Sequence, residues 1–470
     1  MKLSALLLIP AVLSAKPLLR TPADFPLLGE LEPLWISEIY DSPDRSASLA
    51  TLADHPAYLE LLKKHDITLL GGPTIGQLTP NSAVIWFRTA RPAEVMVTAN
   101  GKKFGPVKTT FETDLTGQIS LTGLPPFSEI PYELLIDGKK ASPAPENLSF
   151  QTPPPPGNRA QFSVAFGACS RFVPRAEPIW EVMAAQNPLA YLTLGDNVYI
   201  DLPLDQQKQR VHYYRRQFHP SYRVLTASTG IYSIWDDHDF GKDDQEGGPL
   251  VSSPAWKLKN FQVFARNWNN PAYAGGQEHP GCFYDFRIGD VHFIMTDGRY
   301  YRDSKGDSML GPFQQAWLLN TLATSDSRFK VLCSGTLWTE KADKGGRDSW
   351  QGFRKDRDEI FTLIRDRKIP GVFLISGDRH RHEMFKMEFD VGYPLYEFES
   401  AKVTNIHTHD ANPHALFSYN KGNFFGMLDF DFIAEDPTVT FRCVNEKGES
   451  PKHLTFTTSL SKLSPATTPE

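Results

Sequence analysis

The chain has 470 residues, of which 40% are apolar and 22% are charged, and its formal net charge is −6 at pH 7. This composition is typical of an ordinary globular protein, and the length suffices for two or three domains. The mild acidity gives no global signal for binding nucleic acid or an anionic membrane surface. The 37 prolines and 33 glycines favour many turns and short elements over a long helical bundle.

Residues 1–15 resemble an export signal. Lys2 supplies a positive start, Leu3 to Leu13 form a short apolar run, and Ala15 ends a small-residue cleavage sequence. The run is too short to span a bilayer. The alternative is a buried N-terminal helix, but the apolar stretch stands at the chain end with the flanks of a signal. We therefore expect a secreted or periplasmic protein.

Residues 16–70 are expected to form a loop-rich leader with one amphipathic helix at 55–64. From 71 to 152 the pattern changes to short alternating strands separated by turns, which predicts a small all-β sandwich of the fibronectin or immunoglobulin kind. The prolines Pro153 to Pro156 cannot continue a strand or a helix, so they predict a stiff extended link and a domain boundary. The predicted sandwich strands are 82–88, 94–98, 117–121 and 132–136.

Residues 158–457 follow a repeated pattern of strand, loop and helix. Four short apolar runs have the composition of strands buried on both faces of a sheet: 162–166, 190–194, 231–235 and 371–376. Helices are predicted at 178–186, 204–217, 255–268, 312–324 and 354–367, and further strands at 291–297, 330–335, 395–399, 423–432 and 438–444. The last three strands are expected to be antiparallel. The end, 458–470, is rich in Ser, Thr and Pro and is expected to be loose.

Each of the four apolar runs ends on a polar cluster. Ligands of open α/β sheets bind just beyond the carboxyl ends of the strands, so all four clusters are expected to face one crevice. One acidic strand end would be unremarkable, but four that together carry Asp, His, Tyr and Cys favour a metal centre. The candidates, in chain order, are Cys169 and Arg171, Asp196 and Tyr199, Asp237 and His238, and Asp378 and His380.

Two of the clusters suggest particular ligands. Asp196 at a strand end can bridge two cations, and the phenol of Tyr199 can fold back to bind one of them, which a hard trivalent ion such as Fe(III) would support. Asp378 and His380 are two residues apart and can share a metal. The alternative for the first cluster is an ordinary turn with a packed tyrosine. His382 and Glu383 are expected at the surface or behind the ligands.

The run Asp236-Asp237-His238-Asp239 places three carboxylates and an imidazole in four residues. Their mutual repulsion is costly unless a cation neutralises it. Asp237 is the expected ligand, His238 the expected donor to charge that develops on a phosphoryl group, and Asp239 the carboxylate that orients the imidazole. The alternative is a solvated acidic turn.

Cys169 is either a metal ligand or a small buried hydrophobe, because a thiolate needs a cation or cationic neighbours to be stable. Arg171, two residues later, would suit a phosphate oxygen of the substrate. If Cys169 binds metal, then Cys282, Cys333 and Cys443 allow at most one disulfide.

Four motifs resemble, in order and residue type, those of the alkaline phosphatase D (PhoD-like) family: Gly-Ala-Cys-Ser, Leu-Gly-Asp-Asn-Val-Tyr, Trp-Asp-Asp-His-Asp and Ser-Gly-Asp-Arg-His. The resemblance covers about residues 71–444. It implies an α/β (α+β) fold of the metallophosphoesterase type, a sheet sandwich with helices outside, preceded by the small all-β domain.

The resemblance also implies an Fe(III)/Ca(II) centre, export, and hydrolysis of phosphate mono- or diesters by attack of a metal-bound hydroxide or oxide. The implied ligands are Cys169, Asp196 and Tyr199 for iron, with Asp237, Asp378 and His380 completing the cluster. Where family members often have an Asn-rich stretch, this chain has Phe240-Gly-Lys-Asp-Asp244.

Other functions remain open from the sequence. A nuclease or a phospholipase D-like phosphodiesterase would show a long basic groove or an apolar rim. A non-catalytic surface-binding protein would keep metal only for structure, in a closed coordination sphere. Purple acid phosphatases share Gly-Asp-x-x-Tyr, but they also use a Gly-Asn-His run and two later histidine motifs, which this chain lacks. We expect a phosphate ester as substrate, a monomer, and no specific nucleic-acid or membrane partner.

Overall fold

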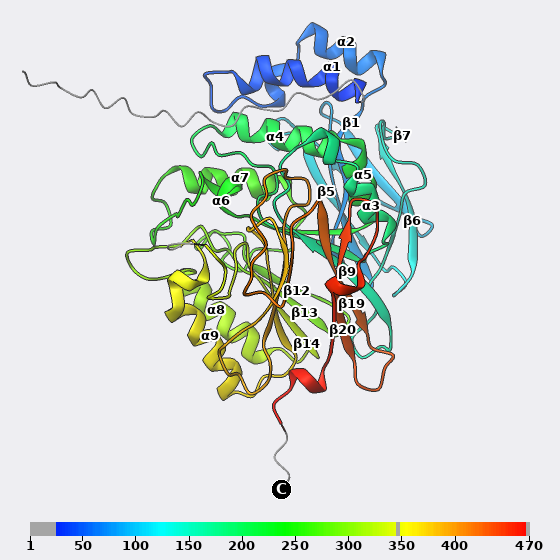
Figure 1. Cartoon of the computed structure of the whole chain (residues 1–470). Helices are drawn as coiled ribbons and strands as arrows, with labels where there is room; N and C mark the ends of the chain where they lie inside the picture. Colours follow the sequence, from blue (N-terminus) through cyan, green and yellow to red (C-terminus); the bar gives the residue numbers. More distant parts are fainter. Residues whose placement is uncertain (1–24, 345–347, 467–470) are drawn as a thin grey trace, which may run out of the picture.

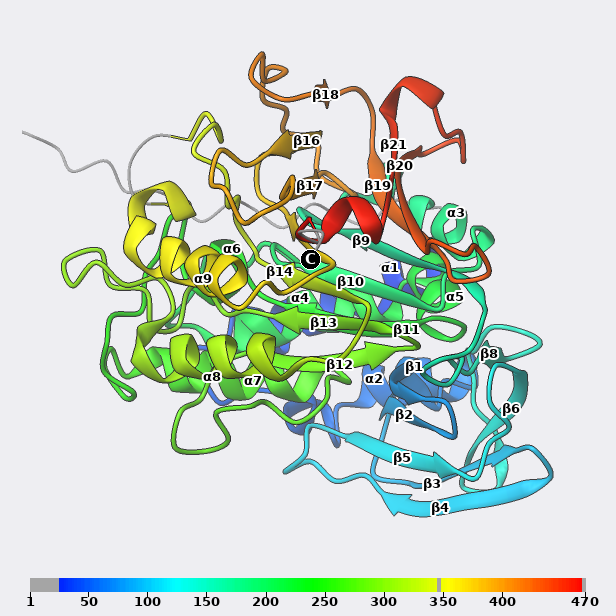
Figure 2. The same cartoon turned by 90° about the horizontal axis from the view of Figure 1, so that it is seen from below.

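The computed structural model describes residues 25–344 and 348–466, so the expected export signal lies outside the described residues. Within them, four sheets build the molecule: two small ones from residues 69–151 and two large ones from residues 161–459 (Figures 1 and 2). None of the described helices combines the length and the apolar character needed to cross a membrane.

The two small sheets are antiparallel. One contains β1 (Leu69–Thr79), β2 (Ser82–Thr89) and β5 (Thr116–Thr122), and the other contains β3 (Glu94–Ala99), β4 (Lys102–Lys108), β6 (Glu129–Ile136), β7 (Lys139–Lys140) and β8 (Ser149–Gln151). Both contribute side chains to one apolar core, for example Ile85 and Val97. All four predicted strands are confirmed. β4 was not predicted because its side chains are mostly exposed and lack alternation. The fibronectin- or immunoglobulin-like character stays a prediction.

The first large sheet has the strand order β11-β10-β9-β19-β20-β21. Its strands are β9 (Gln161–Gly167), β10 (Ala190–Leu194), β11 (Gly230–Ile234), β19 (Phe424–Asp431), β20 (Thr438–Asn445) and β21 (Thr455–Ser459). The first three are parallel to one another, and β19 runs antiparallel to both β9 and β20. The antiparallel orientation predicted for β19 and β20 is therefore confirmed.

The second large sheet has the order β12-β13-β14-β15-β17-β16-β18. Its strands are β12 (Tyr284–Ile288), β13 (Val291–Met295), β14 (Phe329–Cys333), β15 (Val372–Ser376), β16 (His382–Lys386), β17 (Tyr396–Ser400) and β18 (Phe417–Tyr419). β17 lies antiparallel to β16, as expected, but parallel to β15, so the antiparallel expectation holds on one side of β17 only. The reason is that β16 does not pair with β15. It pairs with the far side of β17, so β17 is the strand that lies next to β15.

The two large sheets share a core in which aromatic rings from one sheet meet those of the other, such as Phe293 with Phe430 and Phe398 with Phe441. Helices lie outside, α3 and α5 beside the first sheet and α8 and α9 beside the second (Figure 1). Their bounds are α3 (Ile179–Ala185), α4 (Gln206–Phe218), α5 (Pro220–Thr226), α6 (Asp237–Phe240), α7 (Trp256–Asn267), α8 (Gly311–Thr324) and α9 (Arg354–Asp366). The five helices predicted in this part are confirmed, whereas α5 was not predicted.

The described part of the leader, residues 25–70, contains more helical structure than its sequence indicated. It contains α1 (Pro26–Trp35), a π-helical turn (Ile36–Tyr40), a 3-10 turn (Leu49–Leu52) and α2 (Pro56–Lys64). The last of these confirms the helix predicted at 55–64. α1 packs on α4 through Trp35, whose ring centroid lies 5.9 Å from those of Tyr214 and Phe218 (Figure 1). This burial stabilises a segment whose sequence carries two prolines and only a weak pattern.

The predicted stiff link and the predicted loose tail are both partly buried. Pro153 and Pro154 of the tetraproline are buried, whereas Pro155 is half-buried and Pro156 is exposed, so only the first half of the link is covered. Residues 458–463 are not a loose tail, because β21 extends to Ser459 and the following turn buries Leu463 completely. A few apolar side chains suffice to dock such a segment despite its Ser/Thr-rich composition.

Candidate metal centre

The four polar clusters meet at one place. Three follow β9, β10 and β11 of one large sheet, and the fourth follows β15 of the other. The backbone N–H of Ser170 donates to the carbonyl of Asp196 at 2.7 Å, and the Cys169 thiol lies 3.5 Å from the carbonyl oxygen of Asp378. The prediction that the clusters face one crevice is confirmed, although the crevice is formed by two sheets rather than by one.

A cavity of about 610 Å³ opens over these strand ends. Its wall includes Arg171, Asp196, Tyr199, Asp237, His238, Asp378 and His380 from the predicted set, and Cys169 lies behind Asp196. A larger hollow of about 1090 Å³ beside Trp86 and α7 carries none of the predicted site residues. The smaller cavity is therefore the candidate site.

Two glycines allow the strand ends to approach so closely. A Cβ on Gly195 would lie 2.5 Å from the Cβ of Asp236, and its φ of +102° is in the region that favours glycine. A Cβ on Gly377 would lie 2.3 Å from the Cβ of Ala168. Any side chain at these positions would push the clusters apart.

Cys169, Asp196 and His380 form a buried group of three ligand types. One ligand atom from each lies within 4.8 Å of the other two. The phenol of Tyr199 joins them, because its oxygen lies 3.0 Å from Nε2 of His380. Oδ1 of Asp196 and Nδ1 of His380 are buried and have no hydrogen-bond partner among the described residues. Buried polar atoms without partners are rare in proteins, so these two atoms are candidates for binding a cation.

Burial makes the charged forms of these ligands costly. It raises the pKa of the Cys169 thiol well above its ordinary value, and the Asp196 carboxylate adds to that shift. Burial likewise raises the pKa of Asp196 well above its usual range, although the nearby His238 opposes the change. A bound cation would remove this penalty, because metal ligands of these types bind in their deprotonated forms.

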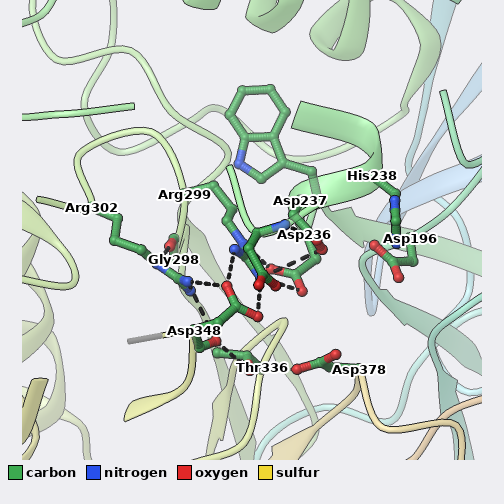
Figure 3. A network of polar contacts seen from close by, with 12 residues as sticks. Asp196, Asp236, Asp237, His238, Gly298, Arg299, Arg302, Thr336, Asp348 and Asp378 are labelled. Carbon is green, nitrogen blue, oxygen red and sulfur yellow. Dashed lines mark hydrogen bonds and ion pairs between the residues drawn. The ribbon is translucent and has the colours of Figure 1, made fainter. Parts of the chain in front are cut away.

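The three carboxylates of the acidic run serve different purposes. Asp236 is held by Arg299, whose Nη2 lies 2.9 Å from its Oδ2, and Arg299 also pairs with Asp348 (Figure 3). Only Asp237 lines the cavity. Burial alone would raise the pKa of Asp237, but Arg299 and His238 lower it below its usual range, so this carboxylate is ionised. The run is thus buried rather than a solvated turn, and an arginine neutralises part of it.

Asp201, not Asp239, orients His238. Oδ1 of Asp201 lies 2.5 Å from Nδ1 of His238, whereas Asp239 accepts hydrogen bonds from the backbone of Asn197 and Val198 at 2.8 and 3.0 Å. The expectation for Asp239 was wrong because its side chain turns back to fix the loop after β10. The ring of His238 stacks on Tyr199 with centroids 4.3 Å apart.

His238 is held in its protonated form. Burial alone would lower its pKa, but Asp196, Asp237 and Asp201 outweigh that effect and raise it to about 10. Since Nδ1 is engaged by Asp201, Nε2 is the nitrogen that can donate a proton into the cavity.

Asp378 occupies a separate corner of the cavity. Its Oδ2 accepts hydrogen bonds from Lys344 Nζ at 2.6 Å and from Thr336 Oγ1 at 2.8 Å. Lys344 also pairs with Asp348 and lies 3.8 Å from Asp244. The role of Asp378 as a metal ligand stays a prediction, because an ammonium group already faces its carboxylate.

Several site residues have left-handed backbone conformations. Positive φ angles are uncommon for residues other than glycine, and strained ones cluster at functional sites. Here they occur at Cys169 (59°), Asp196 (55°), Tyr199 (53°), Asp201 (58°), Asp378 (92°) and His380 (54°). The surrounding sheets hold these turns in place, which aims the side chains into one cavity.

Sequence reasoning missed cavity residues that come from loops. Lys344, Asn405, His407 and His409 belong to loops without a regular pattern. Asp201 could have been noticed, because it follows Tyr199 by two residues. His382 and Glu383, in contrast, are fully buried in β16 rather than at the surface. All four cysteines are buried free thiols.

Two solved structures share this fold. A structure of PhoD superposes with a TM-score of 0.69 at 17% identity and covers 85% of this chain and 93% of that one. A purple acid phosphatase from seeds of yellow lupin (Lupinus luteus) gives a TM-score of 0.60 at 13% identity over 85% of this chain and 78% of that one. The sheet arrangement is therefore of the kind found in these two phosphatases.

The profile of a family described as PhoD-like phosphatase matches residues 164–455, and that of a domain of unknown function matches residues 66–155. The first match covers more than half of the chain, which therefore belongs to the PhoD-like phosphatase family, as its motifs predicted. Alkaline phosphatase D of Bacillus subtilis (strain 168) is 22% identical over 334 residues. That match spans 61% of this chain but only 56% of the relative, so the chain matches about half of the relative's length.

Proposed function

We propose that this chain is an exported, metal-dependent phosphoesterase that hydrolyses phosphate mono- or diesters in the cavity described above. The observation that carries the proposal is the buried group of Cys169, Asp196 and His380 with Tyr199, placed beside the protonated His238 in a PhoD-like chain. The export signal expected at residues 1–15 from the sequence supports a location outside the cytoplasm.

The donor atoms fit the two cations that the family resemblance implies. A thiol, an imidazole and a phenol suit iron, and the phenolate of Tyr199 would suit Fe(III) in particular. Asp237 lies with Asp243 and Asp244 in a second group, whose carboxylate oxygens suit Ca(II). When bound, such cations would neutralise the charge of the ester and activate the attacking water.

The chain's own residues would then bind and protonate the ester. Arg171 lines the cavity and would bind a phosphate oxygen through its planar guanidinium. His238 would hold its proton at Nε2 and pass it to the leaving oxygen, while Asp201 keeps the imidazole in place. Lys344 balances the negative charge of Asp378 and Asp348 in the wall of the site.

Metal content measured together with turnover tests the proposal. We expect the purified protein to contain iron, to show a visible phenolate-to-metal absorption band, and to hydrolyse p-nitrophenyl phosphate or bis(p-nitrophenyl) phosphate. Tyr199→Phe should remove the band and leave the fold intact, because the ring that stacks on His238 remains. A metal-loaded protein that hydrolyses neither ester would instead support the non-catalytic alternative, and a colourless, iron-free but active protein would overturn the iron assignment.

A further inference from the structure

Three imidazoles meet at the mouth of the cavity. His380 follows β15, and His407 and His409 lie on the loop between β17 and β18. One ring nitrogen of each lies within 4.8 Å of the others, and the ring centroids of His407 and His409 are 5.2 and 5.3 Å from that of His380. His407 is exposed and His409 is half-buried, so solvent reaches the group.

The loop that carries the two outer histidines is held in place by hydrogen bonds. The backbone N–H of Asn405 donates to the Cys169 carbonyl at 3.1 Å. The side chain of Asn420 donates to the carbonyl of His409 at 2.9 Å, and Arg381 donates to the carbonyl of Asp410 at 2.7 Å. A loop anchored on both sides of the histidines presents them in a fixed arrangement, which reduces the entropy lost on binding a ligand.

The chemistry of the group selects the kind of ion. Imidazole nitrogens suit borderline transition metals, whereas Ca²⁺ and Mg²⁺ need oxygen ligands. The charged groups nearby are Arg379, Arg381 and Lys402, with Asp378 as a carboxylate among them and Asp196 on the inner side of His380. A hard cation without carboxylate ligands would gain little against these positive charges. Three neutral imidazoles, in contrast, are a known ligand set for Zn²⁺ with a fourth position left open.

We propose that His380, His407 and His409 form a separate binding site for a borderline divalent transition metal ion, for which Zn²⁺ is the probe. The site shares His380 with the group of Cys169 and Asp196. Zn²⁺ held by the three histidines therefore withdraws one ligand from the candidate hydrolytic centre, and the metal acts as an inhibitor. The binding itself does not depend on the function proposed above.

Equilibrium dialysis of the full chain, purified with its resident metal, tests the binding without any substrate. We expect one saturable Zn²⁺ site per chain beyond the resident metal. His407→Ala and His409→Ala should each weaken this site by at least about 10-fold, since even ligand-supporting residues change metal affinity 10- to 100-fold. Co²⁺ in place of Zn²⁺ should give visible absorption bands that both variants lose.

His414→Ala is the matched control, because His414 is exposed on the same loop but lies outside the three-histidine group. It should bind Zn²⁺ as the wild type does. Melting temperatures of the variants should match the wild type, as expected for side chains that are at least partly exposed. The inference fails if the wild type has no saturable Zn²⁺ site, or if both variants keep its affinity. Zn²⁺ binding that survives in a protein without esterase activity would leave this inference standing and reject the proposed function alone.

Discussion

At the scale of single residues, the pair of His238 and Asp201 offers the sharpest test of the proposed chemistry. His238→Ala should lower kcat by about 10²- to 10⁴-fold, as expected when a proton donor is lost from the transition state. Its metal content should remain, because the proposed ligands are other residues. Asp201→Asn should cost about 10- to 100-fold through misplacement of the imidazole. Steady-state kinetics and metal analysis of both variants measure these effects.

The pH profile separates positioning from a merely structural role of Asp201. This carboxylate helps to raise the pKa of His238 to about 10, so its neutralisation should lower that pKa. His238 is charged below its pKa, and the fall in rate at alkaline pH should therefore begin at a lower pH in Asp201→Asn. Asp205→Asn, four residues away, should leave the profile unchanged. An identical alkaline limb in wild type and Asp201→Asn would contradict the role given to Asp201.

The ammonium group of Lys344 lies between carboxylates that could otherwise bind a metal ion. Burial alone would lower its pKa, but Asp378, Asp348 and Asp237 raise it well above the usual value, so it is protonated at all working pH values. Lys344→Met should leave the carboxylates of Asp378 and Asp348 facing each other. We expect Ca²⁺ affinity, measured by titration calorimetry, to increase at least about tenfold, or about 1.4 kcal/mol.

Lys341→Met provides the control for this change. Lys341 pairs with Glu388 at 2.8 Å and is more exposed than Lys344. Its substitution should leave Ca²⁺ affinity unchanged. If Lys344→Met also leaves Ca²⁺ affinity unchanged or lowers it, the ammonium group of Lys344 does not compete with a metal ion beside Asp378.

At the scale of elements, the junction between α4 and α5 carries a histidine that makes stability depend on pH. His219 is fully buried, and neither ring nitrogen has a hydrogen-bond partner among the described residues. Burial, with help from Arg216 and Arg215, lowers its pKa to about 3. Below pH 6.5 the unfolded chain binds a proton that the folded chain excludes, so stability that is complete above pH 6.5 is lost progressively towards pH 3.

His219→Phe should remove this dependence. The ring packs against Phe25 at a centroid distance of 4.2 Å, and a phenyl ring can keep that contact. At pH 7.5 the free energy of unfolding should stay within about 1.5 kcal/mol of the wild type. At pH 5 the free energy of unfolding of the variant, relative to the wild type, should be roughly 2 kcal/mol higher than at pH 7.5. Urea unfolding at both pH values measures these free energies, and the substitution His453→Phe at an exposed position is the control. An equal difference at the two pH values would show that His219 does not titrate in this range.

At the scale of the whole molecule, the small sheets and the large sheets are joined by a buried polar seam. Arg88 of β2 is fully buried, and its Nη2 donates to Asp114 Oδ2 and to Asn267 Oδ1 of α7, each at 3.0 Å. The side chain of Asn269 donates to the carbonyl of Thr74 in β1 at 2.8 Å. Because these hydrogen bonds join the two parts through buried side chains, we expect the described parts to unfold together.

Arg88→Ala should therefore destabilise the entire chain. Removing one partner of a buried ion pair leaves the other charge uncompensated, which costs about 3–5 kcal/mol. We expect a single unfolding transition at lower urea concentration when fluorescence and circular dichroism are compared. Arg91→Ala, at an exposed position, should change the free energy of unfolding by less than about 0.5 kcal/mol. Two separate transitions in the wild type would show instead that the sheets near the N-terminus unfold on their own.

The sequence by itself determined the strands of the catalytic part and the residues that follow them. The runs before Asp196 and Asp378 are so apolar that only a buried strand accommodates them, and a turn must come next. Such local rules depend on neighbours in the chain, so the family motifs and most ligand candidates could be found without coordinates. These local rules failed for β4 and α1, because the hydrophobic patterns of both are weak and both depend on packing against other segments.

Only the tertiary structure decided which of these residues face one another. Asp201 rather than Asp239 holds His238, Arg299 holds Asp236, and Lys344 approaches Asp378 from a distant loop. The physical reason is that charges on turns can pair in many ways of similar energy along the chain. The packing of two sheets, with their strand ends together, selects one of these pairings.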